Sequence, residues 1–283
     1  MNRTLISSNF DQHNGAHSAP PFPYQNQLLA VLPEDIFESL HSSLELVSMR
    51  LGDVIYESGC RIRHVYFPTT SIISLLHILE DGQTTEIAMA GNKGMVGVQT
   101  FMGGISMPNR AVVQNGGYAY RLNRDIFMRE FGRSGGRRSG ALQHLLLRYT
   151  QALLTQIAQT SVCYRHHSVS QQMCRWLLLR LDRSTTNTLV VTQELIGEML
   201  GVRREAITAA AGQLRSAGLI NYNRGHLTVL DRPQLEATAC ECYGVVKSEF
   251  DRLLPDLITS EANSTRPGQA RHKGFDATLI ELR

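Results

Sequence analysis

The sequence predicts an α+β fold, with an N-terminal β-roll of the jelly-roll type, a long helix, and then two short helices and a β-hairpin. Three observations support this order. Short β-rich runs separated by turn glycines fill residues 46–122, apolar residues recur at helical spacing over 139–165, and two helical patterns joined at a glycine precede a hairpin pattern within 192–231. Because the apolar period changes between these regions, we expect them to fold as successive units.

The composition is that of an ordinary soluble chain. Of its 283 residues, 42% are hydrophobic and 19% are charged, which allows a sizeable core and about two domains. No stretch approaches the roughly 20 consecutive apolar residues that a membrane span needs, and the N-terminus lacks a signal-peptide pattern. We therefore expect a cytoplasmic protein. The odd and scattered set of cysteines predicts reduced thiols: Cys60, Cys163, Cys174, Cys240 and Cys242.

The predicted roll is based on five β-rich runs, DVIYESG, HVYFP, SIISLLHIL, TTEIAMA and RAVVQ. Turn residues separate them at Gly52, Gly59, Asp81-Gly82 and Gly94. Short strands at this spacing predict a sandwich, a barrel or a jelly roll. Asp81-Gly82 further predicts a tight hairpin in which both central residues have positive φ.

A long amphipathic helix is predicted from Ser139 to Arg165. Its apolar seam consists of Leu142, Leu146, Tyr149, Leu153 and Ile157. Such a seam must be covered, either by the chain's own domain or by the same helix of a second copy, and the pattern leaves both open. A second helix is expected to begin at Ser168, where Ser168 and Gln171 can form a capping box.

Two short helices and a hairpin follow. Thr192 is a suitable N-cap for the first helix, TQELIGEML, and Gly201 ends it. The second helix starts at once, and Gly197 supplies the small residue that a close helix crossing needs. The segment LINYNRGHLTVLD then predicts a hairpin that turns through Asn223-Arg224-Gly225. Together these elements make a winged helix-turn-helix.

Charged residues in the first turn of the second helix predict contact with double-stranded DNA, because this turn of a helix-turn-helix enters the major groove. The guanidinium groups of Arg203 and Arg204 match the two acceptors of guanine, and Glu205 can accept from cytosine. Thr208 is placed to touch a thymine methyl or a phosphate. The alternative is a solvated face on which the arginines pair with Glu205 or Glu198. The predicted DNA-binding set is Thr192, Gln193, Arg203, Arg204, Glu205, Thr208 and Arg224.

Several motifs resemble the Crp/Fnr family of bacterial transcription regulators over roughly residues 27–257. They are LGDVIYESG, the VYFP run, GMVGV with NRAVV, and TQELIGEMLGVRREAIT followed by LINYNRGHL. The resemblance implies a cyclic-nucleotide-binding-like roll and a homodimer joined through the long helices, with the seam from Leu142 to Ile157 at the interface. It also implies recognition helices one DNA turn apart on a near-palindromic site.

The resemblance also assigns base reading. Arg204 and Glu205 match the family's Arg-Glu pair, whereas Ala209 stands where a third reader, usually arginine, is expected. Residues 168–257 balance ten basic against ten acidic side chains, so a DNA surface there must come from local clustering. Residues 121–165 carry eight basic against two acidic side chains, net +6, which suits either phosphates or an acidic partner such as RNA polymerase.

In the roll, Arg110 matches the phosphate-binding arginine of family members that bind cyclic AMP. Val98 replaces the glutamate that holds the ribose, and Ile157-Ala158 replaces a hydroxyl pair that holds the base. The candidate ligand pocket comprises Gly97, Val98, Arg110 and Ala111. We expect no tight binding of cyclic AMP, because the ribose hydroxyls would lack a buried partner. Another anionic ligand stays open, the effector is not identified, and no cofactor is predicted.

Other sensor chemistries have weaker support. No cysteine precedes Cys60, which excludes the N-terminal iron–sulfur type of sensor. His64 and His77 lie in the roll and are candidate axial ligands for haem, but a lone histidine on a strand is more often a surface or core residue. His166-His167 and Cys240-Glu241-Cys242 are weak metal or redox signals, because no further ligand stands at a recognisable spacing.

We expect no enzymatic activity. A metal enzyme of the cupin type needs two closely spaced histidines and a carboxylate, and the histidines of the roll are thirteen residues apart. The main alternative is a regulatory ligand-binding module that acts through protein contacts without DNA. The expected organisation is a disordered lead over 1–24, a β-roll sensor domain over 25–135, a dimerisation helix over 136–167, a winged helix-turn-helix over 168–257 and a flexible tail over 258–283.

Overall fold

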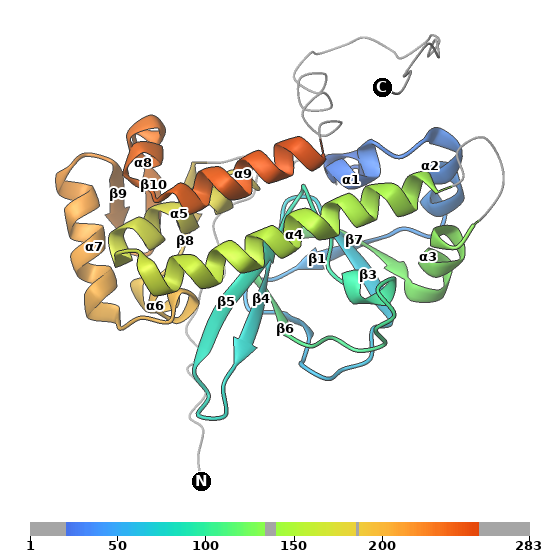
Figure 1. Ribbon diagram of the computed structural model, residues 1–283, viewed down its shortest axis with the longest axis horizontal. Helices are drawn as coiled ribbons and strands as arrows, with labels where there is room; N and C mark the ends of the chain where they lie inside the picture. The colour runs from blue at the N-terminus through green and yellow to red at the C-terminus, as the bar shows by residue number, and fades with distance from the viewer. Residues whose placement is uncertain (1–20, 134–139, 185–186, 255–283) are drawn as a thin grey trace, which may run out of the picture.

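The computed structural model describes residues 21–133, 140–184 and 187–254. The predicted order is confirmed, since a roll, a long helix and a winged helix-turn-helix follow one another along the chain (Figure 1). Residues 1–20 of the predicted lead and the whole predicted tail lie outside the described residues, and Pro23–Gln25 at the end of the lead forms a 3-10 helix, η1. No helix in the described ranges is long and apolar enough to cross a membrane.

Two antiparallel sheets form the roll. Their strands are β1 (Glu45–Met49), β2 (Val54–Tyr56), β3 (His64–Pro68), β4 (Ile72–Ile78), β5 (Thr84–Ala90), β6 (Arg110–Asn115) and β7 (Gly117–Asn123). The strand order is β1-β7-β3 in one sheet and β2-β6-β4-β5 in the other. Short helical elements accompany the strands, namely α1 (Gln27–Ala30), α2 (Glu34–His41), η2 (Val98–Thr100) and α3 (Arg124–Phe131).

The continuous apolar run in β4 is explained by burial on both faces of its sheet. Ile73 and Leu75 belong to the core of the roll, whereas Ile72 and Leu76 belong to the core of the C-terminal half. Alternate side chains of a strand point to opposite faces. This strand therefore lies between two cores and connects them.

The predicted hairpin at Asp81-Gly82 joins β4 to β5, but its turn differs from the expected one. Gly82 has a φ of 85°, while Asp81 is not among the described residues with positive φ. The Asp81 carboxylate accepts a hydrogen bond from the Gln83 N–H at 2.9 Å. This local bond holds the turn without a left-handed conformation at Asp81, so the prediction of two positive φ values was wrong.

The long helix is α4 (Ala141–His166), close to its predicted span. Its predicted dimer seam faces inward: Leu142, Leu146, Tyr149 and Leu153 are at most 4% exposed in the single chain, and Ile157 packs half-buried against the same core. The roll covers this seam, and α9 (Glu241–Leu253) packs along the helix (Figure 1). A helical period reveals an apolar face but not what covers it. In the single chain, the roll therefore covers the seam that the sequence assigns to a second copy.

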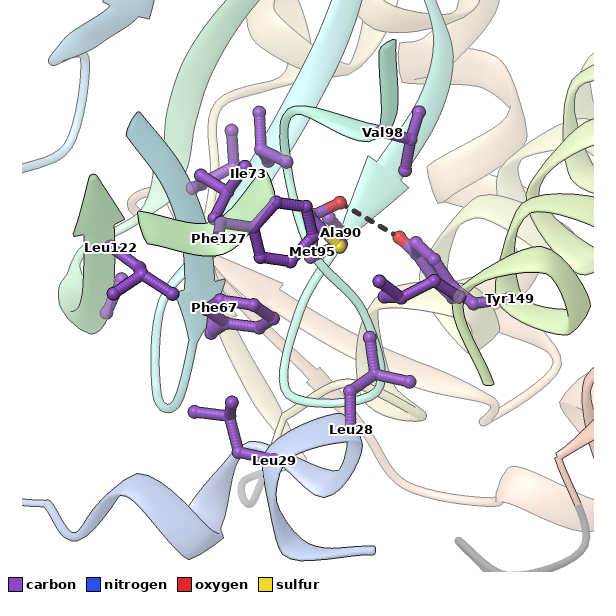
Figure 2. Packing of buried hydrophobic residues seen from close by; sticks show 14 of the residues in the cluster. Leu28, Leu29, Phe67, Ile73, Ala90, Met95, Val98, Leu122, Phe127 and Tyr149 are labelled. Carbon is purple, nitrogen blue, oxygen red and sulfur yellow. Dashed lines mark hydrogen bonds between the residues drawn. The ribbon is translucent and has the colours of Figure 1, made fainter. Parts of the chain in front are cut away.

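Aromatic side chains and the long helix close the core of the roll (Figure 2). The rings of Phe67 and Phe127 have centroids 6.4 Å apart, and the buried Tyr149 hydroxyl donates to the Met95 carbonyl at 3.0 Å. A Cβ at Gly94 would lie 2.5 Å from the Tyr149 hydroxyl oxygen. Glycine is needed there for this close approach, and not for a turn.

The C-terminal half consists of α5 (Val169–Leu181), β8 (Thr188–Val190), α6 (Gln193–Leu200), α7 (Arg204–Ser216), β9 (Ile220–Asn223), β10 (His226–Val229), α8 (Arg232–Thr238) and α9. The three strands form a sheet in the order β8-β10-β9. The predicted capping box is confirmed, because Ser168 and Gln171 each bond the other's backbone N–H, at 3.3 and 3.1 Å.

A buried ion pair joins the two halves. Arg180 of α5 donates from Nη2 to Oε2 of Glu86 on β5 at 2.9 Å, and both side chains are 4% exposed. The Ser74 hydroxyl also bonds the Glu86 carboxylate, and the guanidinium carbon of Arg180 lies 4.0 Å from the centre of the Trp176 ring. Tyr164, near the end of α4, donates to the backbone carbonyl of Glu86 at 3.1 Å. Two cores and the long helix thus meet at one glutamate.

We expect Arg180→Ala to lower the free energy of unfolding by about 3–5 kcal/mol, since it leaves the Glu86 carboxylate buried without its counter-charge. Urea denaturation of the full chain measures this loss. Arg215→Ala, on an exposed position of α7, is the matched control and should stay within about 0.5 kcal/mol of the parent. Arg180→Met combined with Glu86→Leu should recover most of the loss. A loss below about 1 kcal/mol for Arg180→Ala would contradict this role of the pair.

Candidate nucleic-acid interface

The wing docks beside the start of α6. The Thr192 hydroxyl caps this helix by accepting the Leu195 N–H at 3.1 Å, as the sequence predicts. The Val191 N–H donates to the Gly225 carbonyl at 2.8 Å, and the Tyr222 hydroxyl donates to the Val191 carbonyl at 2.8 Å. These last two bonds hold the wing next to Val191, the residue before the N-cap Thr192.

Two glycines make the helix-turn-helix tight. Gly201 ends α6 with a φ of 66°, in the left-handed region that favours glycine. A Cβ at Gly197 would lie 2.9 Å from the Val202 carbonyl oxygen, so a larger residue would push the turn away from α6. Ile207 of α7 is fully buried. The face of α7 that carries Ile207 packs against the core, and the opposite face of its first turn is exposed.

The first turn of α7 carries the residues predicted to read bases. Arg203 is the N-cap, and Arg203, Arg204 and Glu205 are all exposed. The positive end of the helix dipole adds to the guanidinium charges. One turn later, the Thr208 hydroxyl lies 2.8 Å from Gln193 Oε1 and 3.1 Å from the Arg204 carbonyl oxygen, and it donates to these acceptors. The methyl group of Thr208 can thus meet a thymine without loss of a hydrogen bond.

The wing turn carries a third exposed arginine. Arg224 and Gly225 have φ values of 47° and 81° in the two-residue turn between β9 and β10, a geometry that matches the twist of a hairpin. Within the described ranges, no ion pair involves Arg203, Arg204 or Arg224. The alternative in which neighbouring glutamates neutralise the arginines of α7 is not observed.

The starts of α6 and α7 and the wing surround an open hollow of about 350 Å³. It brings together four of the seven residues predicted to contact DNA, namely Thr192, Gln193, Arg204 and Arg224. The other three, Arg203, Glu205 and Thr208, do not line it and lie on or beside the first turns of α7. The hollow is therefore lined by two cations from different elements, Arg204 of α7 and Arg224 of the wing.

Tyr222 forms a wall of the hollow that the sequence did not single out. Its hydroxyl is held by the Val191 carbonyl, and burial raises the pKa of this hydroxyl despite the nearby charge of Arg204. Only its place near Arg224 in the hairpin pattern could have suggested this role. Glu194 also lines the hollow and adds a negative charge to it.

The candidate ligand positions in the roll are largely occupied by the chain itself. Val98 and Ala111 belong to the buried core, where they pack against other side chains of the chain. A Cβ at Gly97 would lie 3.1 Å from Val65 Cγ1. Arg110 is half-buried, and its Nε lies 3.3 Å from Glu57 Oε2. An anion at this position would have to compete with the Glu57 carboxylate.

Two family models match the chain. A cyclic nucleotide-binding domain matches residues 46–134, and a Crp-like helix-turn-helix domain matches residues 171–238. Together the two matches span more than half of the sequence. No curated protein matches the chain.

Solved structures with the same fold include three bacterial proteins. FixK2 from Bradyrhizobium japonicum is 17% identical, with a TM-score of 0.58 over 70% of this chain and 98% of that chain. The c-di-GMP responsive global regulator CLP from Xanthomonas campestris is 11% identical, with a TM-score of 0.57 over 70% and 100% of the two chains. TTHA1359, a transcriptional regulator of the CRP/FNR family from Thermus thermophilus, is 20% identical, with a TM-score of 0.53 over 69% and 98%.

The two matched domains stand in the order that the resemblance predicts, and α4 runs between them. The hollow with its exposed arginines lies in the part that matches the Crp-like helix-turn-helix domain. This chain therefore belongs to the Crp/Fnr family of transcription regulators.

Proposed function

We propose that this chain regulates transcription by binding a near-palindromic DNA site as a homodimer, under the control of a signal received by the roll. The cluster of Arg203, Arg204 and Arg224 carries the proposal. These arginines are exposed at the start of α7 and at the tip of the wing, and none forms an ion pair within the described residues. Unpaired cations beside a helix N-terminus suit a polyanion.

Base reading is assigned to the first turn of α7. In the major groove, Arg204 would donate two hydrogen bonds to guanine, and Glu205 would accept one from cytosine. Ala209 offers no such group, so each half-site loses one bidentate contact, worth about 1–3 kcal/mol of discrimination. Arg224 on the wing and the capped start of α6 at Thr192 are assigned to phosphates.

The exposed side of α4 is the surface that we assign to the second copy. Leu147 and Leu154 are each 50% exposed. Exposed positions recur at alternating steps of four and three residues, at Leu147, Gln151, Leu154, Ala158, Ser161 and Arg165. An average period of 3.5 residues is that of a two-stranded coiled coil, so the same stripe of a second α4 fits this one. This face replaces the inward seam as the dimer interface.

The proposed signal is not cyclic AMP. Val98 has no acceptor for the ribose hydroxyls, and each buried hydroxyl left without a partner would cost about 1–3 kcal/mol. The phosphate would also compete with Glu57 for Arg110. An anion that displaces Glu57 is the class of ligand that this position allows.

RNA polymerase is the protein partner that the family membership supports. The net +6 stretch over 121–165 is a second argument, because a positive surface suits an acidic partner. Three of its arginines already form ion pairs, which are Arg121 with Glu45, Arg124 with Asp125, and Arg133 with Glu130. Asp125 and Glu130 are already counted in the net charge, so only the pair with Glu45 lowers it, by one.

We expect the full-length protein to enrich a two-fold-symmetric site from a random duplex DNA library at about 0.15 M salt, where non-specific phosphate contacts are weakened. Arg204→Ala should bind the enriched site with about 1–3 kcal/mol less affinity, and it should lose preference at one base pair of each half-site. Sequencing of the selected pool and fluorescence anisotropy measure the two effects.

Arg215→Ala is the charge-matched control for Arg204→Ala, because Arg215 is exposed in the last turn of α7 and does not line the hollow. This variant should keep the preference of the parent. Equal affinity and equal preference in the parent and in Arg204→Ala would favour the alternative module that acts through protein contacts alone.

We expect the pair Leu147→Glu and Leu154→Glu to convert the dimer into a monomer, because carboxylates of both copies would meet in one seam. Sedimentation velocity measures the oligomeric state. Ile105→Glu, on a loop of the roll where Ile105 is 64% exposed, adds one carboxylate elsewhere and should leave the dimer intact. A dimer that survives the double substitution would place the interface on another face.

Titration calorimetry of the full chain with cyclic AMP should show no binding tighter than about 1 mM. The physical reason is the absence of a ribose acceptor at Val98. Micromolar binding would mean that another residue supplies this acceptor, and the argument from Val98 would then be wrong.

A further inference from the structure

We propose that Cys163, His167, Cys240 and Cys242 bind a single Zn²⁺ ion. One ligand atom from each residue, three thiol sulfurs and one imidazole nitrogen, lies within 4.8 Å of all the others. Three cysteines and one histidine are a common ligand set of tetrahedral structural zinc. The site does not depend on the proposed DNA binding, and neither family model extends over all four residues.

The spacing of the ligand atoms fits a tetrahedron around zinc. The sulfurs of Cys163 and Cys240 are 3.5 Å apart, and the Cys242 sulfur is 3.6 Å from His167 Nδ1. Bonds of about 2.3 Å to sulfur and about 2.1 Å to nitrogen place ligand atoms roughly 3.6–3.8 Å apart at tetrahedral angles. Small side-chain rotations would therefore be enough to enclose the ion.

The fold supplies the ligands as two pairs from the ends of two helices. Cys163 lies in the last turn of α4, and His167 follows four residues later as its C-cap, with its N–H bonded to the Cys163 carbonyl at 3.1 Å. Cys240 is the N-cap of α9, and Cys242 is in the first turn of that helix. Because α9 packs along α4 (Figure 1), residues 77 positions apart meet at this point.

The surroundings of His167 prepare it as a ligand. Its Nε2 lies 3.2 Å from Glu241 Oε1, so a proton on Nε2 leaves the Nδ1 lone pair directed toward the thiols. A carboxylate on the far nitrogen of a histidine is the usual second partner of a zinc ligand. The three thiols are at most 4% exposed. Four protein ligands in a closed position match a structural ion and not a catalytic one.

A buried cation balances the charge of the proposed site. Zinc with three thiolates carries a net charge of about −1. The Arg175 side chain is 2% exposed and acts electrostatically on both Cys163 and Cys242. It donates to the Thr160 hydroxyl at 2.6 Å, but its Nε has no hydrogen-bond partner within the described residues. A buried guanidinium needs a counter-charge, and zinc thiolates would supply one.

The first test is the metal content of the full chain, purified under reducing conditions without chelator and measured by mass spectrometry. We expect about one zinc ion per chain in the parent. Cys240→Ser and His167→Ala should each reduce the zinc content by at least about tenfold. Cys60→Ser and His166→Ala are the controls, since Cys60 and His166 are exposed and outside the cluster, and both should retain zinc.

A second test uses the parent chain alone, in case a variant fails to fold. Protein stripped of metal by a chelator should bind Co²⁺ with a stoichiometry of about one. Thiolate-to-cobalt charge-transfer bands should appear, and Zn²⁺ should then remove them by displacing the cobalt. Glu241→Gln should weaken Zn²⁺ binding by about tenfold, because it loosens the orientation of His167.

Two outcomes would overturn the proposal. One is a reduced, folded parent chain that holds no zinc and shows no saturable Co²⁺ spectrum. The other is a disulfide between Cys163 and Cys240 that persists under the reducing conditions of the purification and excludes metal, which would make these two thiols a structural cross-link and not zinc ligands. Loss of DNA binding would decide neither case, so the two proposals fail independently.

Discussion

The ion pair between Arg180 and Glu86 is the contact on which the relation between the two halves of the molecule depends. Both side chains are 4% exposed, so neither charge would be hydrated if its partner were removed. The Glu86 carboxylate takes hydrogen bonds from α5 and from Ser74 of β4, while its backbone carbonyl accepts the Tyr164 hydroxyl from α4. A change of register in β4 or β5 would therefore move the groups that bind Arg180 of α5, the helix that precedes the helix-turn-helix.

Much of the fold could be predicted from the sequence, because many of its determinants are local. The capping box at Ser168, the cap at Thr192, the helix end at Gly201 and the wing turn at Arg224-Gly225 each depend on a few consecutive residues. The covering of α4 could not be predicted in this way. Its inward and outward stripes both recur at helical spacing, and only the packing of the roll and α9 decides which one is buried.

The candidate sites likewise combine residues that a local pattern predicts with residues that only the folded chain brings together. The exposed place of Arg204 could be predicted from the helix-turn-helix pattern, whereas Tyr222 comes to line the same hollow only after the wing has folded back. Glu57 could not be assigned to Arg110, because the two residues stand on different β-rich runs. The cysteine pair at Cys240 and Cys242 was visible but incomplete, since its other ligands come from the end of α4.

These constraints converge on α4, which contributes a different face to each neighbour. Its inner seam closes the roll through Tyr149, its outer stripe around Leu147 and Leu154 is exposed, and its last turn brings Cys163 to the start of α9. Tyr164 in that last turn donates to the backbone carbonyls of both Glu86 and Met199. The end of α4 therefore holds the roll and α6 at fixed positions relative to one another. In the dimer that we propose, α4 would set the axis and also anchor α6, and it would thereby fix the separation of the two recognition helices. A signal could then alter DNA binding by small rotations about α4 without unfolding either domain.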